Sequence, residues 1–275
     1  MDISTFHRGR PGQASTAGAP PRRRLLRACA VLAASAFVAI DGHAAAAEIN
    51  VYSAAAVQAP VTELAEQFER STGHKVHFTF STAGGTDTAI LGGAHADLVI
   101  NARERLDALA TRKLLAGAAD LARVRVGVAV RAGGARPDLS TPDTLRAALL
   151  AASSIAAGEP GKGATTGIHF AAVLDKLGIA AAVQGKLRYA PNGLEVMRMV
   201  ARGDAELGIT QISEIMHIAP ATLVGPLPDA LQLTTTYAIA AGQHGAAATA
   251  EAARAFTELL LSKEGQARFR AAGFN

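Results

Sequence analysis

Residues 159–170 read EPGKGATTGIHF and follow a short apolar strand pattern at residues 155–157. The turn is rich in glycine and threonine, and it runs directly into a helical pattern of apolar residues. A helix N-terminus exposes backbone N–H groups without partners, and Thr165 and Thr166 can add hydroxyl groups there. Such a turn is suited to bind a small anion, a phosphate or a carboxylate. It can equally be a capped helix start with nothing bound, so the rest of the chain has to decide.

The same strand-and-helix unit recurs along the chain. Strand patterns are predicted at residues 48–53, 75–80, 97–100, 124–130, 155–157, 187–189, 207–210 and 234–240. Helical spacing of apolar residues is predicted between them, at about residues 60–72, 87–91, 106–114, 143–151, 167–177, 196–201 and 247–269. Residues 220–228 are predicted to be mostly loop. This alternation predicts an α/β fold with a mainly parallel sheet.

The first 47 residues have the pattern of an export signal. Residues 22–27 (RRRLLR) form a basic segment, residues 28–40 an apolar one, and residues 43–47 supply small side chains for cleavage. The apolar segment is too short for a comfortable membrane span. We therefore predict a signal peptide over residues 1–47, cleaved near Ala45–Ala47, with the general secretory and twin-arginine routes both open.

Removal of this leader removes the positive charge of the chain. The whole sequence has 27 Lys and Arg against 23 Asp and Glu, and the leader contains six of the basic and two of the acidic residues. The mature protein is therefore balanced, which argues against nucleic acid as a partner. The sole cysteine, Cys29, also lies in the leader, so no disulfide or thiol chemistry is expected.

Five loops are predicted to meet at one edge of the sheet, because ligands of open α/β sheets bind beyond the C-terminal ends of the strands. All five consist mainly of small residues or neutral hydrogen-bonding groups. They are residues 53–56, 82–86, 161–167, 192–193 and 211–214. Their convergence predicts a binding site and favours the anion interpretation of the opening turn.

The sequence contains no G-x-S-x-G, no H-E-x-x-H and no Cys/His set, and residues 161–166 lack the spacing of a P-loop. We therefore expect no cofactor, no metal and no catalytic residues, and a binding protein rather than an enzyme. His169 and Glu214 have structural interpretations, as a partly buried helix histidine and as an acid that bridges two segments. A hydrolase with these two residues as acid–base partners is the weaker alternative, and it requires them to lie within hydrogen-bond reach.

Several segments, in this order, resemble the periplasmic molybdate-binding protein family. They are SAAA at 53–56, the strand and loop at 80–86, GAHADL at 93–98, GEP at 158–160, ARGDAELGI at 201–209, LSKEG at 261–265 and GF at 273–274. The resemblance covers essentially the whole mature chain. It implies a two-lobed, type II periplasmic binding fold, in which each lobe has a mainly parallel sheet flanked by helices. Two hinge crossovers, near residues 124–130 and 234–240, would join one lobe of residues 48–126 and 235–275 to a second of residues 127–234.

The resemblance also implies a function. It implies a periplasmic solute-binding protein of an ABC importer, a monomer that holds a small oxyanion such as molybdate between its lobes and delivers it to an inner-membrane permease. In this family, Ser hydroxyls on the first two loops, backbone N–H groups and a Tyr hydroxyl hold the anion. The Ser positions fall on Ala56 and near Ala83, the N–H donors on Thr166 and Gly193, and the Tyr on Gln211. Three side-chain donors are thus lost or changed, at a cost on the order of 1.5–3 kcal/mol of binding free energy each.

The candidate ligand-binding residues all belong to the five loops. They are Ser53, Ala55, Ala56, Thr82, Ala83, Gly84, Gly85, Thr86, Thr165, Thr166, Gly167, Asn192, Gly193, Gln211 and Ser213. Their hydroxyl and amide groups can replace the lost donors, or can fit a larger ligand. A small organic carboxylate therefore stays the alternative to molybdate, tungstate or another oxyanion, and ligand sensing stays the alternative to transport.

Overall fold

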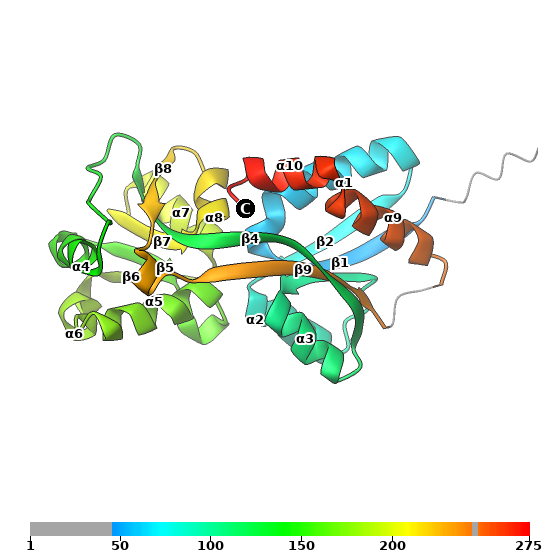
Figure 1. The fold of residues 1–275 in the computed structure, drawn as a ribbon, viewed down its shortest axis with the longest axis horizontal. Helices are drawn as coiled ribbons and strands as arrows, with labels where there is room; N and C mark the ends of the chain where they lie inside the picture. Colours follow the sequence, from blue (N-terminus) through cyan, green and yellow to red (C-terminus); the bar gives the residue numbers. More distant parts are fainter. Residues whose placement is uncertain (1–45, 244–246) are drawn as a thin grey trace, which may run out of the picture. The chain divides into compact units, whose positions relative to one another are not determined.

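The computed structural model describes residues 46–243 and 247–275, which belong to one compact unit. Residues 1–45 of the predicted signal peptide lie outside the described residues. Helices and strands alternate along the chain, and the predicted α/β fold is confirmed (Figure 1). Among the described residues no individual helix is long and apolar enough to cross a membrane. Only the bent pair Thr165–Lys176 and Ala180–Lys186 meets that length and composition test.

The first lobe is built on three parallel strands that carry the N-terminal part of the chain. Strands β2, β1 and β3 lie in this order, and β9 joins β3 in the antiparallel direction. The strands are β1 (Glu48–Ala54), β2 (Lys75–Ser81), β3 (Leu98–Ala102) and β9 (Thr234–Gly242). The helices are η1 (Ala55–Val57), α1 (Gln58–Thr72), α2 (Ala83–Leu91), α3 (Arg103–Thr111), α9 (Ala250–Leu261) and α10 (Lys263–Ala271). One apolar core, which includes Phe68, Phe256 and Phe269, lies between the strands and helices α1, α9 and α10.

The second lobe repeats the arrangement with the central part of the chain. Strand β5 pairs in parallel with β6 on one side and β7 on the other, and β4 joins both β7 and β8 in the antiparallel direction. The strands are β4 (Leu115–Arg131), β5 (Ile155–Gly158), β6 (Leu187–Ala190), β7 (Leu207–Gln211) and β8 (Ala221–Pro226). The helices are α4 (Pro142–Ala151), η2 (Pro160–Lys162), α5 (Thr165–Lys176), α6 (Ala180–Val183), η3 (Gln184–Lys186), α7 (Gly193–Arg202), α8 (Ile212–His217) and η4 (Asp229–Leu231). A second core forms around Val126, Leu145 and Phe170.

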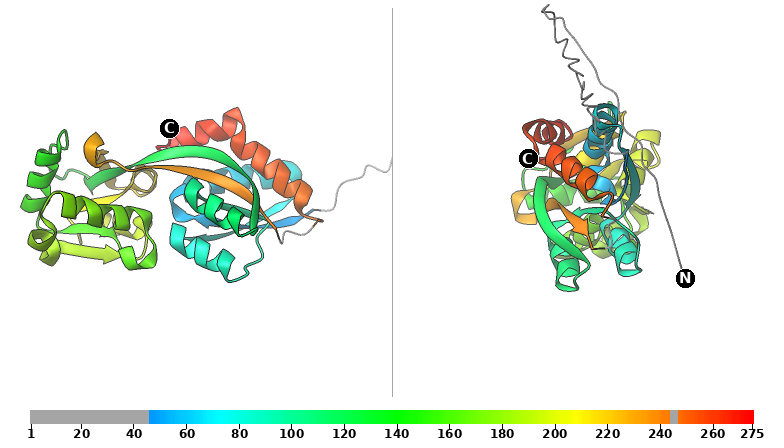
Figure 2. Two further views of the ribbon diagram at one scale, coloured as in Figure 1. Left: turned by 60° about the horizontal axis from the view of Figure 1, so that its bottom comes forward. Right: turned by 90° about the vertical axis from the view of Figure 1, so that its right-hand side faces the viewer.

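Strand β4 belongs to both lobes. Its first part pairs with β9 as far as Arg125, opposite Thr234, and its last part pairs with β7 from Val126, opposite Gln211. Figures 1 and 2 show β4 and β9 running side by side between the two halves. These two strands are the crossovers of the fold, and they meet the predicted positions near residues 124–130 and 234–240.

Several elements differ from the sequence-based predictions. The predicted loops at 82–86 and 211–214 lie mostly in helices, because α2 begins at Ala83 and α8 at Ile212. Strand β4 begins at Leu115 rather than near residue 124, because β9 pairs with the additional segment. Residues 221–226, predicted as loop, form β8 at the side of β4. The long helix predicted to the C-terminus is divided at Ser262, whose side chain accepts a hydrogen bond from the Gly265 N–H and so starts a new helix.

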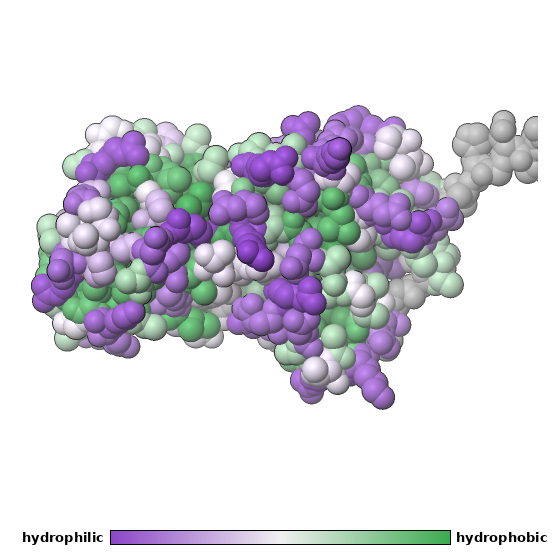
Figure 3. All heavy atoms as spheres, in the orientation of Figure 1, coloured by the Kyte–Doolittle hydropathy of each residue, from purple (hydrophilic) through white to green (hydrophobic). Residues whose placement is uncertain are grey.

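The surface of both lobes is mixed in character. Figure 3 shows hydrophilic side chains spread over one face of both halves, with smaller hydrophobic areas between them. Large apolar side chains that are exposed in the described chain are scattered over different elements. They are Leu91, Ile168, Tyr189, Met216 and Leu261. The C-terminal residues of the parallel strands β1, β2 and β7 come together at one site between the lobes.

Candidate functional site

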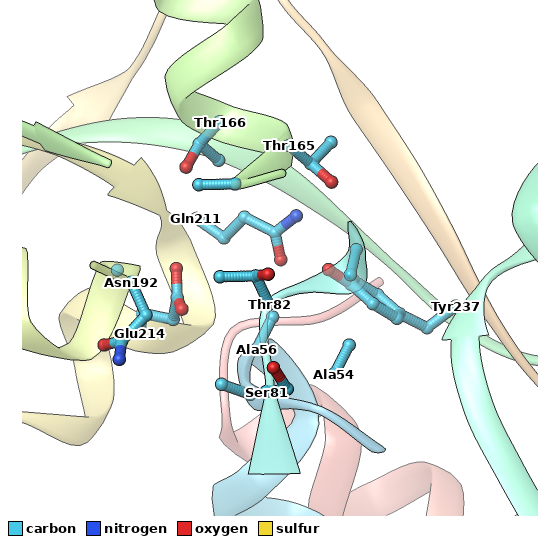
Figure 4. Close-up of a pocket in the computed structure, with 14 residues that line it drawn as sticks. Ala54, Ala56, Ser81, Thr82, Thr165, Thr166, Asn192, Gln211, Glu214 and Tyr237 are labelled. Atoms are coloured by element: carbon cyan, nitrogen blue, oxygen red, sulfur yellow. The ribbon is translucent and has the colours of Figure 1, made fainter. Parts of the chain in front are cut away.

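A small cavity lies where the C-terminal strand ends of the two lobes face each other (Figure 4). Its volume is about 30 Å³, which is room for very few water-sized groups. Residues of both lobes line it. They are Ala54, Ala55, Ala56, Ser81, Thr82, Ala83, Ala164, Thr165, Thr166, Asn192, Gly193, Gln211, Glu214 and Tyr237. We refer to this space as the interlobe cavity.

The wall formed by α5 exposes a helix N-terminus. The residue before this helix is Ala164, and no side chain caps the helix there. Helices α2 and α7 are different, because Thr82 and Asn192 accept hydrogen bonds from the N–H groups of the third helical residues. The first N–H groups of α5 therefore have no side-chain acceptor. They place partial positive charge at the cavity wall.

Two side-chain oxygens in the cavity wall have no hydrogen-bond partner. Thr165 Oγ1 and Gln211 Oε1 are both buried, and Gln211 Nε2 makes only a long contact of 3.4 Å to Thr235 Oγ1. Buried polar groups are nearly always bonded, and an unpaired one costs about 1–3 kcal/mol. A half-turn of the Gln211 amide would exchange its oxygen and its N–H donors. Both groups are thus available to a ligand.

The electrostatics of the wall are unusual for an anion site. Among the residues that the structure describes, no Lys, Arg or His lines the cavity, and its titratable groups are Glu214 and Tyr237. Burial raises the pKa of Glu214, against hydrogen bonds from the Thr210 hydroxyl and the Gln211 N–H, which lower it. Burial also raises the pKa of Tyr237, and the charge of Glu214 raises it further. Tyr237 therefore keeps its proton and can donate a hydrogen bond to a bound anion.

Nine of the predicted ligand-binding residues line the cavity. They are Ala55, Ala56, Thr82, Ala83, Thr165, Thr166, Asn192, Gly193 and Gln211. The opening turn and the other four loops therefore do come together, as predicted from the ends of the strands. The Thr82 hydroxyl already has hydrogen-bond partners within the protein. It accepts a hydrogen bond from the Gly85 N–H and donates one to the Lys162 carbonyl of the other lobe.

Six predicted residues lie near the cavity but do not line it. Ser53, Thr86 and Ser213 are buried, and the Ser53 hydroxyl donates to the Ala54 carbonyl. The three glycines have packing roles instead. Gly84 N–H donates to the Gly163 carbonyl of the other lobe, Gly85 faces the Ser81 side chain, and Gly167 packs on the Gly158 carbonyl.

Sequence reasoning missed four lining residues and undervalued a fifth. Ala54 and Ala164 lie within the predicted loops 53–56 and 161–167 but were not among the predicted ligand-binding residues, and Ser81, the last residue of β2, lies just before the loop 82–86. Tyr237 lies inside β9, and an aromatic residue within a strand pattern is expected to be part of the apolar core. Glu214, for which the sequence favours a structural role, lines the cavity.

The acid–base pair of the hydrolase alternative is not formed. His169 Nε2 lies 2.8 Å from the Leu231 carbonyl oxygen, and His169 does not line the interlobe cavity. Glu214 instead bonds to Thr210. This geometry supports the structural interpretation of His169.

The two lobes, the paired crossover strands and a cavity at facing helix N-termini define a solute-binding protein. Residues 49–275 match the bacterial extracellular solute-binding protein family, and the chain belongs to it. It is similar to an aconitate isomerase from Pseudomonas sp, with 29% identity over 78% of this chain and 83% of the relative. It is also similar to the molybdate-binding protein ModA of Azotobacter vinelandii, with 31% identity over 62% of this chain and 68% of the relative.

Solved structures show the same fold. The periplasmic molybdate-binding protein of Azotobacter vinelandii superposes with a TM-score of 0.67 at 20% identity, over 82% of this chain and 98% of that one. The predicted type II periplasmic binding fold is therefore confirmed.

Proposed function

We propose that the chain binds a small oxyanion, molybdate or one of similar size, in the interlobe cavity and delivers it to the inner-membrane permease of an ABC importer. The observation that carries the proposal is the uncapped N-terminus of α5, beside the unpartnered Thr165 hydroxyl, in a small cavity without cations. Neutral donors and helix N-termini can hold a desolvated anion without a matching cation. Relatives named for molybdate binding support the size of the ligand.

The lost hydroxyl donors have replacements in this chain. Ala56 and Ala83 offer no hydroxyl, whereas Ser81, Thr165 and Tyr237 lie in the same wall. We propose that these three side chains and the first N–H groups of α5 hold the anion oxygens. Asn192 and Thr82 would then shape the wall, since both already serve as helix caps.

Closure of the lobes is part of the proposal. We propose that the predicted lobes, residues 48–126 with 235–275 and residues 127–234, move about β4 and β9 as a hinge. Two of the hydrogen bonds that join them here run from Thr82 Oγ1 to the Lys162 carbonyl, at 2.8 Å, and from Gly84 N–H to the Gly163 carbonyl, at 3.2 Å. We further propose that residues 1–47 direct export to the periplasm, where the mature chain acts as a monomer.

A thermal-shift panel tests the proposed function. The mature chain is heated with molybdate, tungstate, sulfate or one of several organic carboxylates, each at a concentration about 100-fold above an assumed micromolar dissociation constant. Binding at that ratio stabilises the folded state by about 2.7 kcal/mol, and we expect molybdate or tungstate to give the largest shift. An unchanged melting temperature with every anion would contradict the proposal, and a shift with carboxylates alone would favour the carboxylate alternative.

Conversion of the ligand is tested directly, because one relative is an aconitate isomerase. We propose that this chain binds without chemistry. Incubation of either isomer of aconitate with the purified protein, followed by proton NMR, is expected to leave the isomer unchanged. Formation of the other isomer at a rate above the protein-free control would show an enzyme.

Replacement of Thr165 by valine is expected to stabilise the free protein and to weaken anion binding. The Thr165 hydroxyl is buried without a partner, so its removal raises the free energy of unfolding by about 1 kcal/mol. The same hydroxyl is a proposed anion donor, and its loss lowers affinity about tenfold, equivalent to about 1.4 kcal/mol. Urea unfolding and calorimetric titration measure the two effects.

Thr86 supplies the matched control for this experiment. Its hydroxyl is also buried without a partner, but Thr86 does not line the interlobe cavity. Thr86→Val is therefore expected to stabilise the free protein by a similar amount and to leave anion affinity unchanged. Equal anion affinities of the Thr165→Val and Thr86→Val variants would show that the Thr165 hydroxyl does not bind the anion.

A further inference from the structure

Glu214 is the feature of the interlobe cavity that anion binding does not explain. A carboxylate repels an anion, and this one lines the cavity with only 6% of its surface exposed. Among residues 46–243 and 247–275, no Lys, Arg or His forms an ion pair with it. A buried and unpaired carboxylate is costly, so its surroundings favour the neutral acid over the ionised form.

The packing around Glu214 fixes its position. The Thr210 hydroxyl donates to Glu214 Oε2 from the strand below. On the other side, a Cβ atom added to Gly193 would lie only 2.0 Å from the same oxygen, so the carboxyl group rests against the start of α7. Figure 4 shows its side chain between Asn192 and the space below Gln211. The carboxyl group of Glu214 is therefore held in a fixed position in the cavity wall.

No charged neighbour compensates Glu214. Helix α8 packs against β4, β7, β8, α7 and η1, and of these β7, β8 and η1 contain no titratable residue. The other two elements, β4 and α7, do contain titratable residues, and so do α8 itself and the neighbouring β9. These residues are Asp120, Arg123, Arg125 and Arg131 of β4, Glu195, Arg198 and Arg202 of α7, His217 of α8, and Tyr237 of β9.

None of these described groups forms an ion pair with Glu214. The α7 arginines pair with Glu195, and Arg125 of β4 pairs with Asp229. His217 is exposed, and the phenol of Tyr237 is neutral. The nearest titratable group within the cavity is thus Tyr237, which shares the wall with Glu214.

Protonation changes what Glu214 can do for a ligand. A carboxylate only accepts hydrogen bonds, whereas a carboxylic acid has one O–H to donate. Burial already raises the pKa of Glu214 above its ordinary value of 4.5. A bound anion places a further negative charge nearby, which favours the neutral acid still more. The free protein therefore binds fewer protons than the complex wherever Glu214 is ionised before binding.

We propose that Glu214 is a proton-dependent specificity determinant: a fully deprotonated oxyanion binds with Glu214 as the neutral acid, and binding takes up one proton from solvent wherever Glu214 is ionised in the free protein. This inference rests on the proposed function of the same cavity. The acid O–H donates to an anion oxygen and replaces one of the hydroxyl donors that Ala56 and Ala83 lack. The ionised form of Glu214 disfavours molybdate, tungstate and sulfate alike, because these anions have no proton to offer it.

The sign of the pH dependence follows from linkage. Below the pKa of Glu214 in the free protein, the acid is already protonated, so affinity does not change with pH. Between that pKa and the higher pKa of Glu214 in the complex, one proton must be taken up, and the association constant falls about tenfold for each pH unit. The effect is a loss of affinity toward alkaline pH.

Calorimetry with the mature chain tests this proposal. Molybdate and sulfate are titrated from about pH 6 to about pH 9, a range above the ordinary carboxyl pKa, in two buffers with different ionisation enthalpies. The difference in heat between the buffers gives the number of protons taken up. We expect about one proton per anion at the alkaline end, and a falling affinity as the pH rises.

Two variants separate the role of Glu214 from other causes. Glu214→Gln is expected to bring proton uptake to near zero and to flatten the pH profile. Glu195→Gln alters an acid of α7 that pairs with arginines outside the cavity, and it is expected to keep the wild-type proton uptake. The wild-type measurement alone keeps the proposal testable if Glu214→Gln does not fold.

The outcomes distinguish the two proposals. Anion binding without proton uptake in the wild type, or with equal uptake in Glu214→Gln, would overturn the role of Glu214 and leave the proposed function standing. No binding heat with any anion at any pH, in the wild type, would overturn the proposed function itself.

Discussion

Replacing Gly167 with alanine is expected to lower the free energy of unfolding by about 3 kcal/mol and to abolish measurable anion binding. A Cβ atom at this position would lie 2.1 Å from the Gly158 carbonyl oxygen, at the end of β5. Strand β5 cannot yield, because it pairs with β6 on one side and β7 on the other. Helix α5 must therefore move outward, and it takes its N-terminal N–H groups away from the interlobe cavity.

Whether Gly167→Ala lowers or raises the free energy of unfolding shows which of two opposing effects is larger. Gly167 lies in a helix, where alanine is intrinsically favoured over glycine by about 1 kcal/mol. Close packing of α5 on β5 has to overcome that preference. Urea unfolding of Gly167→Ala is compared with Gly185→Ala, an exposed glycine whose Cβ would meet nothing within 4 Å. An unchanged or increased stability of Gly167→Ala would show that α5 does not press on β5 in this way.

Replacing Gly84 with valine is expected to hold the lobes apart and to lower anion affinity at least tenfold, about 1.4 kcal/mol. A Cβ atom on Gly84 would lie 2.9 Å from the Gly163 Cα, and one on Gly163 would lie 2.8 Å from the Gly84 Cα. This backbone contact joins α2 of one lobe to the turn before α5 of the other. A valine side chain there blocks closure without entering either core.

The free and the ligand-bound states should respond differently. We expect Gly84→Val to keep the melting temperature of the free protein, and to lose the decrease in radius of gyration that molybdate produces in the wild type, as measured by X-ray scattering. Gly161→Ala is the control, because Gly161 lies in the facing turn and its Cβ would have no neighbour within 4 Å. Normal compaction of Gly84→Val with molybdate would contradict a closing contact at this point.

Much of the fold is predictable from the spacing of apolar residues. Strand β3 is buried at all five positions, in agreement with its uninterrupted apolar centre, and β1 begins where the leader was predicted to end. The first part of β4 was not predictable in this way. Its sequence LAGAADLAR is poor in strand-forming residues, and it is a strand because β9 pairs with it through two register shifts.

The C-terminal helices show a signal that could have been used. Ser262 is followed by Lys263, Glu264 and Gly265, and a serine before a helical pattern marks a helix start. Strand β8 gave no such signal, because Gly225 and Pro226 favour a loop reading. Its pairing with β4 is a tertiary effect that the local sequence does not contain.

The sequence predicts those cavity residues that lie in loops after parallel strands. Loops after parallel strands meet at the C-terminal edge of a sheet, and this rule brought together residues such as Ala56, Thr165 and Gly193. The rule does not predict Tyr237, because this residue lies within an antiparallel crossover strand rather than in a loop. Glu214 lies on a helix after the strand end, and only its burial beside Thr210 distinguishes it from a surface acid.

Crystals of the mature chain grown with molybdate test the central claim, that an oxyanion is held in the interlobe cavity by neutral donors. Anomalous scattering from molybdenum locates the anion without reference to the protein. We expect one peak in the cavity, within hydrogen-bond reach of the first N–H groups of α5 and of the Tyr237 hydroxyl. A peak bound elsewhere by Lys or Arg side chains, or no peak at a saturating molybdate concentration, would contradict the account.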